Sequence, residues 1–140
     1  MSDFGSGNRP LSVFDISGRA MSAQLVRLNT TASNLANAGT VSGSKASAFR
    51  ALRPVFETAQ QSNGIATVGV DRIVRSNVEP TKRHEPDHPL ADKDGNVWVA
   101  GVDSAAELVE MVEAARQYQN NVQVLQTAKT LTLDTLRLGQ

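Results

Sequence analysis

Residues 28–39 read LNTTASNLANAG, and this stretch decides how the N-terminal part of the chain folds. Leu28, Ala32 and Leu35 keep the spacing of one helical face, but most residues between them are Asn, Thr or Ser, which are poor helix formers. Each of these polar residues costs about 0.5 kcal/mol relative to Ala, and together they remove roughly 3 kcal/mol from an isolated helix. We therefore expect packing against neighbours, rather than local propensity, to order this helix.

The predicted helix around this stretch covers residues 12–37. Ser12 stands before its first turn and Asp15 lies within it, which predicts an N-cap at Ser12. Apolar and small residues recur at alternating steps of three and four, the heptad pattern of a coiled coil. The seam consists of Phe14, Gly18, Met21, Leu25, Leu28, Ala32 and Leu35.

A second predicted helix covers residues 103–138, with a capping box at Ser104-Ala105-Ala106-Glu107 and a stop at Gly139. Two apolar seams follow its surface. One consists of Leu108, Met111, Ala115, Tyr118, Val122 and Leu125, and the other of Val124, Ala128, Leu131, Thr135 and Leu138. A two-helix hairpin buries one stripe per helix, so the second seam predicts contact with another chain.

The central residues predict a small β unit. Residues 49–57 alternate loosely, with Pro54 restricting them to an edge, and Ala66, Val68 and Val70 alternate more clearly. Asp94-Gly95 predicts a turn into a strand at residues 97–99. We predict a mainly α fold with a small β insertion, in which the long terminal helices pack as an antiparallel coiled-coil pair. Its regions are residues 1–40 (N-terminal axial helix), 41–102 (central β-rich region with a linker) and 103–140 (C-terminal axial helix).

Composition excludes several function classes. Fourteen basic residues balance fourteen acidic ones, which argues against a nucleic-acid partner. The chain has no cysteine, and its first residues lack the pattern of a cleaved signal peptide. His84 and His88 are separated by Pro86, so they cannot share a helical face as metal ligands. We expect no metal, no cofactor, no catalytic residue and no small-molecule substrate.

Residues 92–95 read DKDG, which is similar to part of a calcium-binding loop. Aligning Gly95 with the sixth loop position places Leu90 first and Gly101 twelfth, where carboxylates are required. A plain turn is the better interpretation.

Two stretches without charge are typical of a surface that other protein covers. Residues 28–44 and 117–128 contain no charged side chain, and the second stretch is rich in amides that can bond between helices without the desolvation cost of ions. A charge-poor solvated face is the alternative. The predicted assembly interface comprises Phe14, Met21, Leu25, Leu28, Asn34, Leu35, Asn37, Leu108, Met111, Tyr118, Asn121, Val122, Leu125, Leu131 and Leu138.

Both ends of the chain resemble the bacterial flagellar rod and hook axial proteins. The N-terminal matches are residues 15–18 (DISG), 21–24 (MSAQ), 27–29 (RLN) and 32–38 (ASNLANA). The C-terminal matches are residues 110–112 (EMV), 115–122 (ARQYQNNV), 125–129 (LQTAK) and 138–140 (LGQ). Residues 85–92 (EPDHPLAD) also resemble a central segment of the family, whereas Ala100-Gly101 replaces its usual Pro-Asn pair.

The resemblance implies a structural subunit of the proximal rod of the flagellar basal body. Such subunits assemble into a helical tube in the periplasm that serves as drive shaft and export channel. Its implied partners are copies of itself, other rod proteins and the flagellar type III export apparatus, through which it passes unfolded without cleavage of a signal peptide. Order in the terminal helices would then follow assembly. The heptads alone are also compatible with a soluble oligomeric helical adaptor or export chaperone.

Overall fold

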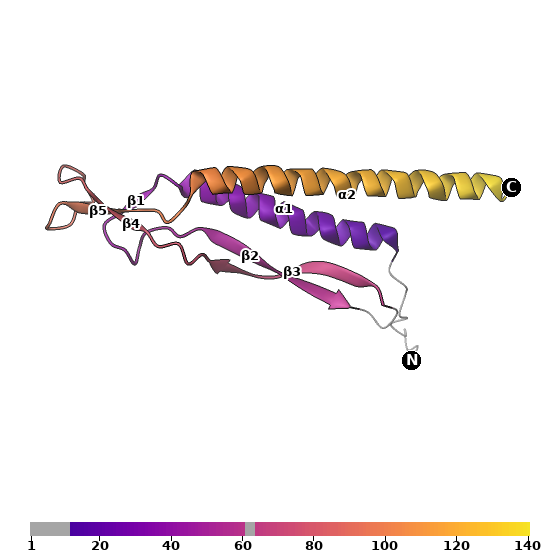
Figure 1. The fold of residues 1–140 in the computed structure, drawn as a ribbon, viewed down its shortest axis with the longest axis horizontal. Coiled ribbons are helices and arrows are strands. Elements are labelled where there is room, and N and C mark those ends of the chain that lie inside the picture. The colour runs from indigo at the N-terminus through magenta and orange to yellow at the C-terminus, as the bar shows by residue number, and fades with distance from the viewer. Residues whose placement is uncertain (1–11, 61–63) are drawn as a thin grey trace, which may run out of the picture.

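The computed structural model describes residues 12–60 and 64–140. These residues form two long helices, a two-stranded hairpin and a three-stranded sheet, arranged as an elongated molecule (Figure 1). Helices α1 (Val13–Asn37) and α2 (Ser104–Leu138) lie side by side and run in opposite directions. The hairpin follows the other side of α1, and the three-stranded sheet lies at the end where α1 stops and α2 starts. The predicted extents of both helices are confirmed.

The two helices begin with different caps. Ser12 caps α1 as predicted, and it forms a capping box with Asp15, in which the Asp15 amide donates to Ser12 Oγ and the Ser12 amide donates to the Asp15 carboxylate. The capping box predicted at Ser104 is wrong. Asp103 caps α2 by accepting from the Ala105 and Ala106 amides, and Glu107 turns into the protein instead. The helix ends at Leu138 before Gly139, which confirms the predicted stop.

The hairpin consists of antiparallel strands β2 (Leu52–Gln60) and β3 (Ala66–Arg75). Leu52 pairs with Arg75 at its base and Gln60 with Ala66 at its far end. A shift of register between Val55 and Phe56 interrupts the ladder. Such irregularities bend a strand and increase its twist, which divides the hairpin into a base and a distal half.

The second sheet joins β1 (Val41–Ser42), β5 (Asn96–Val99) and β4 (Thr81–His84) in the order β1–β5–β4, with antiparallel pairing throughout. The expected turn at Asp94-Gly95 leads into β5, and Gly95 adopts a φ of 73°, which favours glycine. Backbone hydrogen bonds from Ala100 to Thr40 and from Gly101 to Phe49 connect the segment before α2 to the segment after α1.

Large apolar side chains contribute little to the interior. Among the described residues, the buried apolar positions are Ala23, Ala48, Ala51, Val97, Ala100 and Ala114. Because small side chains remove little apolar surface from water, the hydrophobic contribution to stability is modest for a chain of this length. In the part of the chain that the structure describes, neither α1 nor α2 contains the apolar stretch that a membrane span requires.

The expected coiled-coil pair is wrong, and the single β unit is replaced by two separate sheets. In a coiled coil the apolar seam is buried. Here Phe14 and Leu25 are 43% and 44% exposed, and none of the seven seam positions of α1 is buried. The buried residues of α1 are mainly polar or small: Ser17, Ala23, Thr30, Thr31 and Asn34. This difference arises because α1 packs between α2 and the hairpin and uses hydrogen bonds within both contacts.

Candidate functional site

Three polar side chains of the opening stretch, those of Thr30, Asn34 and Asn37, form hydrogen bonds within the chain. Thr30 donates from Oγ1 to the Val26 carbonyl at 2.7 Å, and Asn37 donates from Nδ2 to the Ser33 carbonyl at 2.8 Å. These bonds return to the preceding helical turn, as Thr and Asn side chains commonly do. The side chain of Asn34 reaches across to the hairpin and to α2. Part of the expected support for this helix therefore comes from its own chain.

An ion pair also connects the two helices. The Arg27 guanidinium on α1 donates to Glu110 on α2 from two nitrogens, at 2.9 and 2.5 Å, and lies 3.6 Å from Glu113. Arg27 and Glu110 are both partly shielded from solvent. This pair fixes neighbouring turns of the antiparallel helices opposite each other.

The predicted interface residues fall into three groups. Five are exposed: Phe14, Leu25, Leu108, Leu131 and Leu138. Nine are half-buried: Met21, Leu28, Leu35, Asn37, Met111, Tyr118, Asn121, Val122 and Leu125. Asn34 alone among them is fully buried, and the partners of its side chain lie within the same chain.

Half-buried members on α2 share the face that packs against α1. Glu107 contacts Asn34 on α1, so the face of Glu107 points toward that helix. Met111, Ala114, Tyr118 and later positions follow at steps of four and three, which keeps them on the same face. Much of the first predicted seam of this helix therefore lies against α1.

The end of α2 presents a different surface. It extends beyond the start of α1, and every residue from 129 to 140 is exposed (Figure 1). We define the exposed apolar residues of this segment as the overhang patch: Leu131, Leu133, Leu136 and Leu138. Leu131 is 62% exposed and Leu138 is 88% exposed. Leucines at these spacings occupy several sides of a helix, which is typical of a segment that other protein surrounds.

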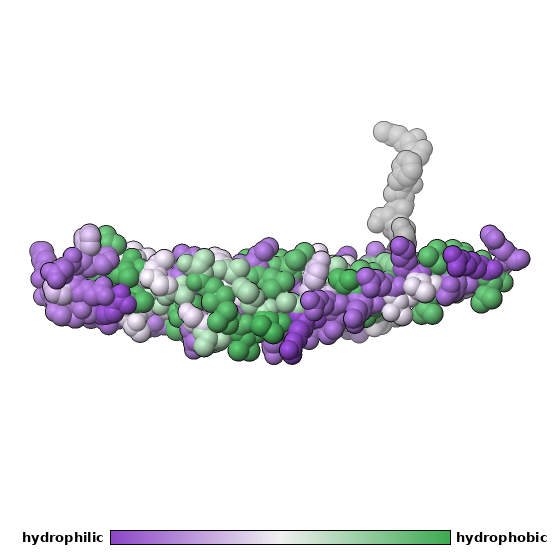
Figure 2. Space-filling model, turned by 90° about the horizontal axis from the view of Figure 1, so that it is seen from above, coloured by the Kyte–Doolittle hydropathy of each residue, from purple (hydrophilic) through white to green (hydrophobic). Residues whose placement is uncertain are grey.

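A second apolar surface covers the outward side of the first half of α2. Leu108, Val109 and Val112 are exposed there, beside Glu113 and Arg116. Figure 2 shows hydrophobic side chains gathered over this part of the helix. Sequence reasoning missed Val109 and Val112, together with Leu133 and Leu136 of the overhang patch. The available signal was that each pair is three residues apart, so that its members share one face of the helix.

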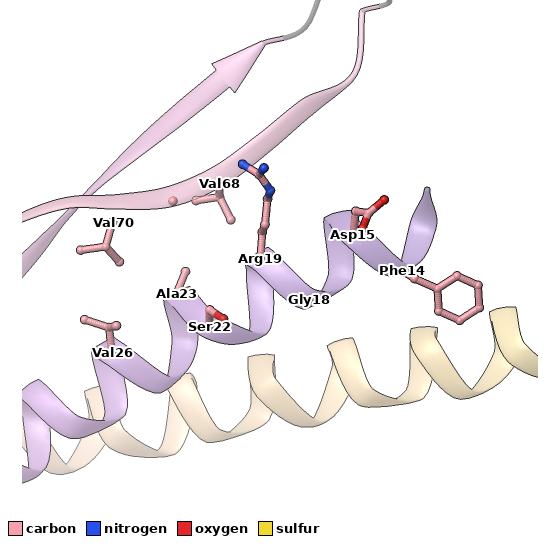
Figure 3. Close-up of a pocket in the computed structure, with 10 residues that line it drawn as sticks. Phe14, Asp15, Gly18, Arg19, Ser22, Ala23, Val26, Val68 and Val70 are labelled. Atoms are coloured by element: carbon pink, nitrogen blue, oxygen red, sulfur yellow. The ribbon is translucent and has the colours of Figure 1, made fainter. Parts of the chain in front are cut away.

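A groove separates the first half of α1 from β3. Figure 3 shows Val68 and Val70 of β3 facing Ala23 and Val26 of α1, whereas the ring of Phe14 points away from the strand. Asp15 and Arg19 of α1 also line this groove, so its walls combine small and apolar residues with one acidic and one basic side chain.

The histidines belong to the three-stranded sheet and its loop. His84 Nδ1 lies 3.2 Å from Asn96 Oδ1, and His88 Nδ1 accepts from the Leu90 amide at 3.0 Å. Among the described residues, no three His, Cys, Asp or Glu side chains lie close enough together to hold a metal ion.

Family models match both ends of the chain. Residues 14–43 match the model described as flagella basal body rod protein, and residues 93–138 match the C-terminal model of the flagellar basal body rod FlgEFG proteins. These two segments contain nearly all of both helices.

Curated relatives match almost the whole chain. Flagellar basal-body rod protein FlgC of Salmonella typhimurium is 43% identical over 132 residues, covering 93% of this chain and 98% of the relative. FlgC of Escherichia coli O6:H1 is 44% identical with the same coverage, and FlgC of Aquifex aeolicus is 33% identical, covering 86% of this chain and 90% of the relative. The chain therefore belongs to the FlgC family of flagellar basal-body rod proteins.

Proposed function

We propose that this chain assembles with further copies and with other rod proteins into the helical tube of the proximal rod, which acts as periplasmic drive shaft and export channel. The chain is a structural rod subunit of the flagellar basal body, and it is not an enzyme. Its family also implies assembly with other rod components. The helical tube, the contacts between copies of this chain and the position in the proximal rod are what we propose beyond the family assignment.

The overhang patch carries this proposal. All four of its leucines are exposed on the part of α2 that reaches and then passes the start of α1, where Leu131 lines a hollow together with Val13 (Figure 1). Burying one leucine contributes about 1.5–3 kcal/mol, so covering the patch would supply a substantial driving force for association. Leu108, Val109 and Val112 add a second uncovered surface on the same helix.

The two uncovered surfaces lie at different places along an elongated molecule. A contact between two such different surfaces is heterologous, and heterologous contacts that do not close a ring generate helical assemblies. Two different uncovered surfaces on one chain therefore support a tube over the closed bundle of a soluble adaptor.

We retain the division into three regions as part of the proposal. Residues 1–40 and 103–140 would form the axial wall, and residues 41–102 would be available for contacts with other rod proteins. The balance of fourteen basic and fourteen acidic residues supports protein partners over nucleic acid. Delivery by the flagellar type III apparatus follows from the family resemblance alone, and so does a periplasmic position.

Leu131→Asp tests the proposal in a strain that lacks its own copy of the protein. Leu131 is exposed, so we expect the purified variant to keep the helical content and thermal midpoint of the unchanged chain. We expect no rods, and no motility, because a charge would have to be buried between subunits. Leu131→Met is the matched control and should form rods. Isolated basal bodies that contain Leu131→Asp at the normal level would contradict the proposal.

A further inference from the structure

Glu107 is a buried charged residue that belongs to neither of the exposed apolar surfaces, so its role is a separate one. It lies in the first turn of α2, and its side chain is 0% exposed. A carboxylate is costly to remove from water unless cations and hydrogen-bond donors surround it. Its partners therefore matter more than those of the exposed acids on the same helix.

These partners come from two other elements. Arg53, on β2, places Nη2 2.5 Å from Glu107 Oε1. Asn34, on α1, donates from Nδ2 to Glu107 Oε2 at 3.0 Å. One carboxylate thus contacts residues 54 and 73 positions away in the chain, which brings both helices and the hairpin together at a single point.

Asn34 extends this cluster to the backbone of the hairpin. Its Oδ1 accepts from the Leu52 amide at 2.7 Å, and its Nδ2 donates to the Leu52 carbonyl at 2.9 Å. The side-chain amide thereby takes the place of a neighbouring strand at the first residue of β2. The three side chains Asn34, Arg53 and Glu107 form what we call the base cluster.

The base cluster gives α2 a direct contact with a hairpin that otherwise packs elsewhere. Among the described elements, the strands of the hairpin pack against α1, and α2 lies along the opposite side of that helix (Figure 1). Beyond the irregularity at Val55 and Phe56, the residues of β2 are exposed. The base of the hairpin therefore depends on Glu107 for its position more than the distal half of the hairpin does.

We propose that Glu107 couples the docking of the hairpin to the pairing of the two helices. When α2 packs against α1, its carboxylate holds Arg53 and Asn34 in the positions that fix the base of β2. When α2 is absent from that position, Arg53 and Asn34 lose this partner and the hairpin base loosens. Such coupling is reciprocal, so a docked hairpin also favours helix pairing.

Hydrogen exchange on the full-length chain, read by mass spectrometry, tests this coupling. Glu107→Leu replaces the carboxylate with an apolar side chain of similar size, which a buried site accepts. We expect protection of peptides covering residues 52–55 and 72–75 to fall at least tenfold. Because the coupling is reciprocal, protection in the middle of α1 and α2 should fall by no more than the same factor, and the two helices should stay paired. Glu113→Leu is the matched control, because it removes an exposed acid from the same helix and should leave the hairpin unchanged.

A second variant provides for the case in which Glu107→Leu does not fold. The double change Arg53→Leu and Glu107→Leu removes both charges together and leaves no unpaired ion. It should loosen the hairpin base and keep the helices paired, as the single change does. The proposal is overturned if the hairpin base of the double variant stays within threefold of the unchanged chain. It is equally overturned if the double variant exchanges as an unfolded chain throughout, because the cluster would then be required for the helices themselves.

Discussion

At the scale of single residues, Asn34 is a poor helix former whose side chain forms hydrogen bonds to two other elements, β2 and α2. Asn34 costs helix propensity but satisfies both backbone groups of Leu52 and one oxygen of Glu107. The sequence identified the unusual stretch and the need for neighbours. It could not reveal that β2 was one of them, because nothing local pairs Asn34 with Leu52.

Asn34→Leu should destabilise the chain by about 2–4 kcal/mol, since it leaves the Leu52 amide and carbonyl without their partner in a part-buried place. Urea unfolding followed by circular dichroism measures this change. Asn29→Leu, at an exposed position of the same helix, should change the free energy of unfolding by less than about 0.5 kcal/mol. Equal effects of the two substitutions would contradict the assigned role of Asn34.

Gly101 is required by a close backbone approach. A Cβ atom there would lie 2.5 Å from the Val78 carbonyl oxygen and 3.0 Å from the Glu79 carbonyl carbon. Gly101→Ala should therefore cost about 1–3 kcal/mol, because backbone must move to admit the methyl group. Gly18→Ala, which meets nothing within 4 Å on α1, should instead stabilise by about 0.5–1 kcal/mol. Thermal unfolding of the two variants distinguishes these opposite signs.

Asp92 makes the turn before β5 sensitive to acid. Its carboxylate accepts from the Asn96 amide and, to a lesser extent, from the Asp94 amide, and these bonds hold the pKa of Asp92 below its usual value of 3.8. A carboxyl with a lowered pKa stabilises the folded turn above the unfolded value, and this contribution is lost as the pH falls below about 4 through the folded pKa. The amide resonances of Asp94 and Asn96 should shift together in that range. Asp92→Asn should abolish the shift, and its persistence in this variant would contradict the assignment.

At the scale of elements, short-range patterns predicted where the helices and some of the strands lie, whereas the heptad spacing of α1 did not predict how that helix packs. The Ser12 cap, the helix extents and the strand at residues 66–70 were correct because each depends on nearby residues. The heptads of α1 misled because α1 contacts two elements and buries Thr and Asn instead of Phe14 and Leu25. The N-cap of α2 is Asp103 and not the predicted Ser104, because the Glu107 side chain contacts Arg53 and Asn34 instead of completing a capping box. Those partners are distant in sequence and were invisible to local reasoning.

The end of α2 should be dispensable for the fold and necessary for assembly. Deleting residues 129–140 removes only exposed side chains, so we expect the free energy of unfolding to change by less than about 1 kcal/mol. The same deletion should abolish rod formation, because it removes the overhang patch. Urea unfolding measures the first effect and electron microscopy of basal bodies the second. A shortened chain that fails to fold would contradict the separation of the two roles.

At the scale of the whole molecule, a small interior accompanies large uncovered apolar surfaces. The described interior contains mainly alanines, whereas leucines and valines of α2 face outward. This distribution is the reverse of that in a self-sufficient domain, and it is expected of a subunit whose core is completed by its neighbours. The composition alone indicates a small interior, since aromatic residues make up only 4% of the chain.

The central claim is that the overhang patch is covered when the rod assembles. The chain has no cysteine, so Leu131→Cys and Leu138→Cys each introduce a single reactive thiol. The rate of maleimide modification is compared between the purified chain and intact basal bodies that contain the same variant. We expect fast reaction in the purified chain and at least a hundredfold slower reaction in the basal bodies. Equal rates in the two states would contradict the account, because the patch would then remain in water after assembly.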